Sequence, residues 1–229
     1  MRLDRFLVQS NICSRSEAKR FVKAGRVGVN GSTASDPSVH IDENKDMVTV
    51  DNNPVVYERF CYYMLNKPQG YVTATRDKDS KTVLDLLDGV KRDDLFPVGR
   101  LDKDTEGLLL ITDNGRLAHD LLSPRHHVDK EYYVEVDRRL TDEEKNAFFT
   151  GIDIGDEKPT LPAKIEEQED AYLVTIHEGR FHQIKRMFKA FDANVTFLKR
   201  LSMGSLVLDE NLEPGQFRPL TDDEVKNLF

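Results

Sequence analysis

The acidic residue Asp102 follows Arg100 and Leu101 in the segment GRLDKDTEGLLLITDNG, residues 99–115, shortly before an apolar run. The run at residues 108–111 predicts a buried strand, so we expect the loop before it to be anchored to the core. A carboxylate held in this way can attack an electron-poor carbon or stabilise an oxocarbenium-like centre, as acidic residues do in glycoside chemistry. The alternative is that Asp102 is an ordinary turn residue in front of a core strand.

A basic helix is predicted further along the chain, in the segment FHQIKRMFKAF, residues 181–191. Helical spacing puts its apolar side chains on one side and its polar ones, Lys185 among them, on the other. An ordinary amphipathic helix with a solvated basic face would show the same pattern. If Lys185 lies beside Asp102, its ammonium opposes the rise in pKa that burial of that carboxylate would cause. Arg186 is adjacent, and a shift of one residue in register would put it in place of Lys185.

Two segments with period-two alternation predict strands further on. In KEYYVEV, residues 130–136, Tyr132 shares one face with two valines, whereas Tyr133 faces the other way. In AYLVTI, residues 171–176, Ile176 shares a face with Tyr172 and Val174. On pattern alone, Tyr132 is a core aromatic and Ile176 a buried aliphatic.

Composition limits the class of protein. The chain has 229 residues, 38% of them hydrophobic and 32% charged, which is typical of a folded soluble protein. No segment approaches the length of a membrane span, and the first residues lack the apolar core of a secretion signal. Cys13 and Cys61 make no disulfide framework and favour a reducing compartment, so we expect a cytoplasmic protein. No metal-ligand spacing, dinucleotide fingerprint or phosphate-binding loop is present, and we expect neither a metal nor another cofactor.

The charge is unevenly distributed along the chain. The net charge is −8, which by itself argues against a nucleic-acid partner. Residues 1–30, however, carry seven Lys and Arg against two acidic residues, and residues 180–200 carry six against one. Two basic regions on an acidic chain would bind phosphate at chosen places, although either region alone could be a solvated surface.

The N-terminal basic region has the features of a capped helix. Ser14 and Glu17 form a capping box, and Gly25 suits the end of the helix. Its basic side chains are Arg15, Lys19, Arg20, Lys23 and Arg26, of which three recur every fourth residue. A basic helix face over a small core suits contact with the sugar–phosphate backbone of RNA. An Asn30-Gly31 hairpin signal follows, between short alternating segments.

From residue 60 onward strand signals dominate. The predicted strands are FCYYML, GYVTAT, LLLIT, KEYYVEV, AYLVTI, NVTFLKRL and SLVL. The predicted helices are TVLDLL, GRLAHDLL, LTDEEKNAFF, FHQIKRMFKAF and LTDDEVKNLF, with capping boxes at Thr141 and Thr221. Strands with irregularly placed helices predict an α+β domain with a mixed, largely antiparallel sheet.

Five strings in this order resemble the RsuA-type ribosomal RNA pseudouridine synthases over essentially the whole chain. They are an N-terminal segment like the S4-type RNA-binding domain (RLDRFL … SRSEAKRFVKAGRVGVNG), NKPQGYVT (66–73), GRLDKDTEGLLLITDNG, DKEYYVEV (129–136) and EGRFHQIKRM (178–187). The resemblance implies a small S4-type α/β domain over residues 1–58. It also implies a catalytic α+β domain over residues 59–229, whose long bent sheet has a cleft across its middle.

The resemblance also implies an activity: isomerisation of a uridine to pseudouridine in ribosomal RNA, with the small subunit as the expected source of that RNA. It makes Asp102 the nucleophile and Lys185 the cation beside it. It places Tyr132 against the target base, where its hydroxyl could assist deprotonation of C5. Ile176 would line the uracil pocket. Whether Asp102 attacks the sugar or the base stays open.

Further basic residues are candidates for contact with the RNA. Arg100 could occupy the gap left by an everted uridine or hold the flanking phosphate, unless it forms a surface salt bridge with Asp104. Arg180, His182 and Lys67 are candidates for contact with phosphate. We expect a monomer that acts on ribosomal RNA within a small-subunit assembly intermediate, with no membrane contact.

Three alternatives remain at this stage. The chain could be a non-catalytic RNA-binding or ribosome-assembly protein, because S4-type domains also occur without this chemistry. It could be a synthase of the same family that acts on large-subunit RNA. A glycosidase of free nucleosides is weaker, because it leaves the basic N-terminal helix without a role.

Overall fold

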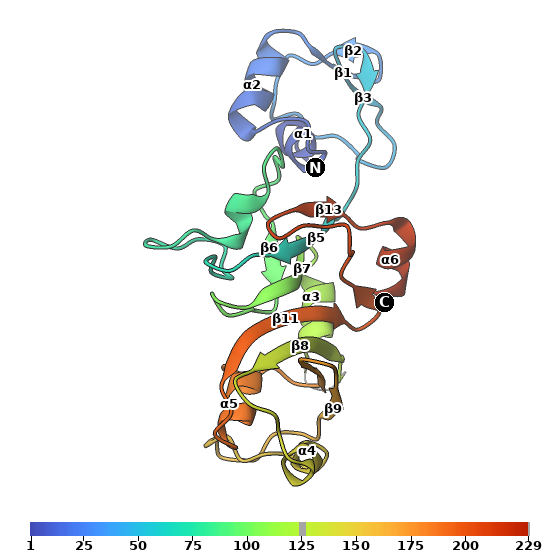
Figure 1. Cartoon of the computed structure of the whole chain (residues 1–229). Helices are drawn as coiled ribbons and strands as arrows, with labels where there is room; N and C mark the ends of the chain where they lie inside the picture. Colours follow the sequence, from blue (N-terminus) through green and yellow to red (C-terminus); the bar gives the residue numbers. More distant parts are fainter. Residues whose placement is uncertain (124–126, 229) are drawn as a thin grey trace. The chain divides into compact units, whose positions relative to one another are not determined.

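The computed structural model of the chain describes residues 1–123 and 127–228. The chain divides into two compact units, Met1–Cys61 with Leu87–Leu95, and Tyr62–Leu86 with Phe96–Phe229 (Figure 1). Across the two described stretches, no helix has both the length and the apolar character needed to cross a lipid bilayer. Each unit is described separately below.

The first unit combines two helices with a small antiparallel sheet of order β2-β1-β3-β4. Its elements are α1 (Leu3–Gln9), α2 (Arg15–Lys23), β1 (Val27–Val29), β2 (Ser32–Thr33), β3 (Val48–Val50) and β4 (Asn53–Pro54). The capping box predicted at the start of α2 is confirmed, because Ser14 and Glu17 each accept a bond from the other's backbone amide. The Asn30-Gly31 turn joins β1 to β2, and both residues have the positive φ of a tight hairpin.

Residues 87–95 belong to the first unit, although they interrupt the second one in the sequence. Buried Arg92 donates hydrogen bonds to the carbonyls of Gln9 and Glu58, the first at 2.6 Å. The backbone amide of Lys91 donates to Asn11 Oδ1 at 2.5 Å. The prediction of a single domain over residues 59–229 did not separate this segment from the rest.

The second unit is built around one mixed sheet. Its strands are β5 (Tyr62–Lys67), β6 (Phe96–Val98), β7 (Glu106–Thr112), β8 (Lys130–Val136), β9 (Lys164–Glu167), β10 (Tyr172–Ile176), β11 (Val195–Met203), β12 (Leu206–Val207) and β13 (Phe217–Pro219). Its helices are the 3₁₀ helix η1 (Val83–Leu86), α3 (Gly115–Leu122), α4 (Asp142–Phe148), α5 (Gln183–Lys189) and α6 (Asp222–Asn227). The strand order is β13-β5-β7-β11-β8-β10-β9, with β12 on β11 and β6 on β7. Among these described strands only β7 and β11 pair in parallel, so the predicted mixed, mostly antiparallel sheet is confirmed.

The burial of the central strands follows the sequence pattern. β7 is buried from Gly107 to Thr112, as its apolar run predicts. β8 and β10 alternate, so that Tyr132 of one and Ile176 of the other are buried. The capping boxes at Thr141 and Thr221 begin α4 and α6, as predicted.

Two predicted elements were wrong. GYVTAT is not a strand, because it forms a single bridge, from Val72 to Thr82. Its residues anchor a loop instead, since the Thr73 hydroxyl donates to the carbonyl of Leu101 at 2.7 Å. TVLDLL contains only the 3₁₀ helix η1. Strands β6, β9 and β13 were missed, because each has at most four residues and little alternation.

A close approach of two backbones fixes the centre of the sheet. Gly107 in β7 lies opposite Arg200 in β11 and has a φ of +101°. A Cβ atom at Gly107 would lie 2.2 Å from the carbonyl oxygen of Arg200 and 2.7 Å from its nitrogen. Only glycine fits here, because both the conformation and the available space exclude a side chain.

We expect Gly107→Ala to lower the free energy of unfolding by at least about 2 kcal/mol, because it combines an overlap with a strained φ. Chemical denaturation measures this change. Gly115→Ala is the matched control, because a Cβ at Gly115 has no neighbour within 4 Å. Equal stability of the two variants would contradict the importance of this contact.

Candidate active site

The loop that carries Asp102 precedes β7 and is fixed by residues 67–73. Besides the bond from Thr73 to Leu101, the backbone amide of Gly70 donates to the carbonyl of Lys103 at 2.7 Å. Within the loop, the amide of Thr105 donates to the carbonyl of Asp102 at 3.1 Å. The backbone of this loop is therefore tied at several successive residues.

Lys67 lies beneath this loop, and the structure corrects its predicted contact with phosphate. Its side chain is completely buried, and its Nζ donates to the carbonyls of Pro68 at 3.1 Å, Asp102 at 2.9 Å and Thr105 at 2.8 Å. Burial lowers the pKa of Lys67 to about 8, with nearby carboxylates, Asp104 first, opposing the shift. Lys67 positions the loop and has no access to RNA.

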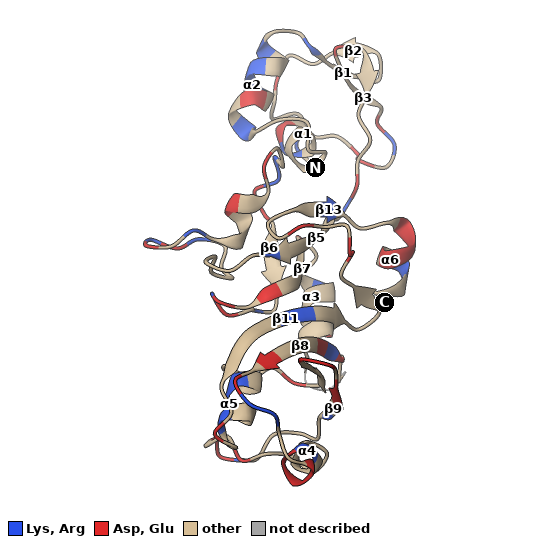
Figure 2. Cartoon of the chain, viewed as in Figure 1, with Lys and Arg blue, Asp and Glu red and all other residues tan. Residues whose placement is uncertain are grey.

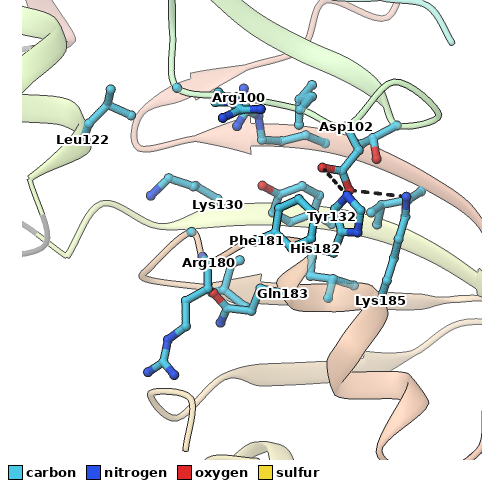
Figure 3. Close-up of a pocket in the computed structure, with 18 residues that line it drawn as sticks. Arg100, Asp102, Leu122, Lys130, Tyr132, Arg180, Phe181, His182, Gln183 and Lys185 are labelled. Carbon is cyan, nitrogen blue, oxygen red and sulfur yellow. Dashed lines mark hydrogen bonds and ion pairs between the residues drawn. The ribbon is translucent and has the colours of Figure 1, made fainter. Parts of the chain in front are cut away.

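The side chain of Asp102 faces Lys185 and His182, from the segment around α5 (Figure 3). Its Oδ2 lies 3.3 Å from Nζ of Lys185, and its Oδ1 lies 3.5 Å from Nε2 of His182. Arg186 is directed elsewhere, because its guanidinium bonds the carbonyl of Ile154 and pairs with Asp156. The structure therefore brings Lys185, and not Arg186, to Asp102.

Lys185 is shared between two carboxylates. Its Nζ lies 2.5 Å from Oδ1 of Asp104 as well as 3.3 Å from Asp102. Burial alone would raise the pKa of Asp104, but the hydrogen bond and charge of Lys185 outweigh it and leave that pKa below its ordinary value. One ammonium thus compensates two negative charges at the pocket.

A cavity of about 460 Å³ opens beside Asp102 within the second unit. Its walls come from the loop before β7, from β8, β10 and β11, and from the start of α5. Tyr132 is 7% exposed and lines it, as does Ile176. Among the described residues the Tyr132 hydroxyl has no hydrogen-bond partner, so it is free to meet a ligand. The structure thus brings Asp102, Lys185, Tyr132 and Ile176 to one cavity.

The predicted RNA-contact residues Arg100 and Arg180 differ in whether their guanidinium groups are already engaged within the protein. Arg100 is exposed beside the cavity and makes no ion pair in the described part of the chain; Asp104 pairs with Lys185 instead. Arg180 points its guanidinium away from Asp102 (Figure 3) and pairs with Glu178 at 2.9 Å. That guanidinium also donates to two backbone carbonyls, so its predicted contact with phosphate is not supported.

Among the lining residues that sequence reasoning missed are two cations and an exposed aromatic: Lys130, Arg200 and Phe181. The alternation of β8 could have found Lys130, because it shares a face with Tyr132. Phe181 is 71% exposed and stacks on His182, with ring centroids 3.8 Å apart. An exposed aromatic next to a basic segment is the signal that could have found it. Arg200 had no signal, because nothing in NVTFLKRL marks it as buried.

The basic residues of α2 and its C-terminal end form a separate surface, on the first unit. All five, Arg15, Lys19, Arg20, Lys23 and Arg26, are exposed, and Figure 2 shows basic residues along α2. The three arginines are partnered, Arg15 by Asp93, Arg20 by Glu17 and Arg26 by Asp51. Lys19 and Lys23 form no ion pair with any residue that the structure describes. These two ammonium groups are therefore the ones most available to phosphate.

Comparisons with known proteins identify the family of the chain. A family model of RNA pseudouridylate synthases matches residues 61–190, and an S4 domain model matches residues 1–46. The chain is 46% identical over 234 residues to YtzG, an uncharacterized RNA pseudouridine synthase of Bacillus subtilis (strain 168), with 100% of this chain and 98% of that protein covered. It is 42% identical over 233 residues to ribosomal small subunit pseudouridine synthase A of Yersinia pestis, with 100% and 98% covered. A crystal structure of a pseudouridylate synthase matches with a TM-score of 0.71 and 38% identity over 100% of both chains.

We expect Lys67→Met to remove a pH dependence of stability. The folded pKa of Lys67, about 8, lies below its ordinary value of 10.5, so between these values the unfolded chain binds more protons. The stability that this group contributes is therefore present above 10.5 and lost as the pH falls through about 8. Denaturation at several pH values across this range should show that the free energy of unfolding of the wild type rises, relative to that of Lys67→Met, as the pH rises. Lys45→Met, which removes an exposed lysine, is the control. If the free energy of unfolding of the wild type fell relative to that of Lys67→Met as the pH rises, the lowered pKa of Lys67 would be refuted.

Proposed function

Since the chain belongs to the RNA pseudouridylate synthase family and is an isomerase of uridine in RNA, we propose that it modifies small-subunit ribosomal RNA with Asp102 as nucleophile. The observation that carries the role of Asp102 is its carboxylate at the wall of the cavity, with Lys185 at 3.3 Å and Tyr132 in the same cavity. The substrate is supported by identity over the full length to a small-subunit enzyme.

The cellular setting is part of the same proposal. We infer that the protein acts in the cytoplasm, as a monomer, on an assembly intermediate of the small subunit. A uridine must leave its stack to enter a cavity of this kind, which favours RNA that is not yet locked into a finished subunit.

The reaction requires a held base as well as a nucleophile. The bond between C1′ and N1 breaks, the uracil turns while it stays bound, and C5 then joins C1′ and loses its proton. The carboxylate of Asp102 attacks the sugar or the ring in the first stage and is released in the last. Lys185 pairs with this carboxylate at 3.3 Å and can balance its charge when the base covers it.

Other residues of the cavity hold the base and the RNA. The ring of Tyr132 forms a face for the uracil, and its unbonded hydroxyl can take part in the removal of the C5 proton. Ile176 limits the depth of the pocket. Arg100, exposed at the rim, is placed to fill the gap in the stack that the everted base leaves.

We expect Asp102→Asn to reduce release of tritium from C5-labelled small-subunit RNA by at least about a thousandfold, since it removes the nucleophile but keeps the shape. Affinity for RNA should change by less than about threefold, because the phosphate contacts remain. Asp104→Asn is the matched control, since it alters the other carboxylate on Lys185, and it should keep most of the activity. Release that persists in Asp102→Asn would remove Asp102 from its role. Release of tritium from large-subunit RNA only would contradict the proposal that small-subunit RNA is the substrate.

We expect Lys19→Ala combined with Lys23→Ala to weaken RNA binding and to flatten its salt dependence. Each phosphate contact that is lost should reduce the slope of log affinity against log salt by about one. Filter binding at several salt concentrations measures this slope. Lys45→Ala with Lys226→Ala is the control, because each of these exposed lysines is paired with an acidic residue. An unchanged slope in the first double variant would show that this face of α2 is only solvated.

A further inference from the structure

Two buried cations line the inner wall of the cavity and have no part in the chemistry described so far. Arg200 lies in β11 and Lys130 begins β8. Arg200 is opposite Tyr132 across the strand pair, and Lys130 is two residues from Tyr132 on the same face. Arg200 is 2% exposed and Lys130 is 9% exposed. Both residues are therefore neighbours of Tyr132 in the sheet and line the same cavity.

The hydrogen-bonding capacity of the two cations is not filled by the protein. Nε of Arg200 donates to the carbonyl of Leu108 at 2.7 Å, but its Nη2 is buried and has no partner in the described part of the chain. Nζ of Lys130 donates to the carbonyl of Val128 at 2.7 Å. Within residues 1–123 and 127–228, neither side chain forms an ion pair.

The environment of the pair disfavours two positive charges. Burial, and then the charge of Arg200, lower the pKa of Lys130, while Asp129 partly opposes them. Asp129 is itself engaged, because its Oδ1 lies 2.7 Å from Nδ1 of His177. Buried charges without a partner destabilise a fold, so their presence at a cavity wall indicates a ligand that brings negative charge or strong acceptors.

The isomerisation produces such a ligand. When the bond between C1′ and N1 breaks, its electron pair goes to N1, and the charge is shared by the carbonyl oxygens O2 and O4. The sugar carbon is compensated by the carboxylate of Asp102. When C5 then joins C1′, the carboxylate is released and C5 gives up its proton, so all other atoms of the uridine are retained and no oxidant or reductant is needed.

The turn of the base imposes a further requirement. C5 replaces N1 when the ring turns about the axis through N3 and C6, and the same turn exchanges O2 with O4. A group of donors that binds either carbonyl oxygen therefore holds the base equally well before and after the turn. A guanidinium and an ammonium that line one cavity provide donors of this kind.

We propose that Arg200 and Lys130 bind the carbonyl oxygens of the target uracil and stabilise the negative charge of the detached base. This inference rests on the proposed function. A phosphate of the RNA is the less suitable occupant, because both side chains are nearly inaccessible whereas the backbone of the RNA stays at the rim. The pair would thus act at the stage when the base has no covalent bond to the sugar.

Binding of free bases tests the site without any turnover. We expect the wild-type chain to bind 5-nitrouracil, whose nitro group makes the ring N–H acidic enough to ionise near neutral pH, at least about tenfold more tightly than uracil in calorimetric titration. Lys130→Met and Arg200→Met should abolish this preference. Lys164→Met removes one charge from the same sheet, at an exposed site in β9, and should keep it. Equal affinity of wild type for the two bases, or a preference that persists in Lys130→Met, would overturn the proposal.

Kinetics on C5-tritiated RNA test the stage at which the pair acts. Lys130→Met should lower kcat by about a hundredfold, the size typical of a lost donor to developing negative charge, with KM for RNA changed less than about threefold. Lys130→Arg, which keeps the charge, should recover part of kcat. A rise in KM with a flatter salt dependence and little change in kcat would assign the pair to phosphate and refute the uracil site. If wild type releases no tritium, the proposed function fails, and the titrations still decide whether this site prefers an anionic base.

Discussion

The rest of the site depends on the hydrogen bonds that the ammonium of Lys67 donates. It donates to the carbonyls of Pro68, Asp102 and Thr105, and so ties the turn after β5 to the loop that carries Asp102. A buried amine is costly, and here the cost is offset by three acceptors in fixed positions. As a result the backbone of Asp102 is held in a fixed position, although Asp102 lies in a loop and not in a strand. Precise placement of this kind is what covalent chemistry on a bound base requires.

Around that fixed loop, the cations lie on two sides of the cavity with different tasks. Lys185, half-buried, forms ion pairs with the carboxylates of Asp102 and Asp104. Arg200 and Lys130 also line the cavity, and neither forms an ion pair with a carboxylate among the described residues. The close contact at Gly107 explains the position of Arg200. It brings β11 directly against β7, the strand that follows the loop carrying Asp102. Sheet geometry and site chemistry are thus set by the same strand pair.

The sequence predicted elements well where a single pattern determined the structure. The alternation of KEYYVEV and AYLVTI, the apolar run of β7 and the three capping boxes all have local causes, and all were confirmed. The wrong predictions have distant causes. Whether a lysine is buried, as Lys67 is, depends on carbonyls more than thirty residues away, and no local pattern records them. For the same reason GYVTAT looked like a strand although Thr73 serves to anchor another loop.

The sequence also predicts only part of the charge distribution. Counting Lys and Arg along the chain located the basic regions, but it could not tell which charges are already compensated. Arg15, Arg20 and Arg26 are paired, so the electrostatic attraction of α2 for a phosphate is concentrated at Lys19 and Lys23. The acidic remainder of the chain repels nucleic acid elsewhere, which limits non-specific binding. A net charge of −8 is therefore compatible with an RNA enzyme, because selectivity comes from where the few uncompensated cations are, and not from the total.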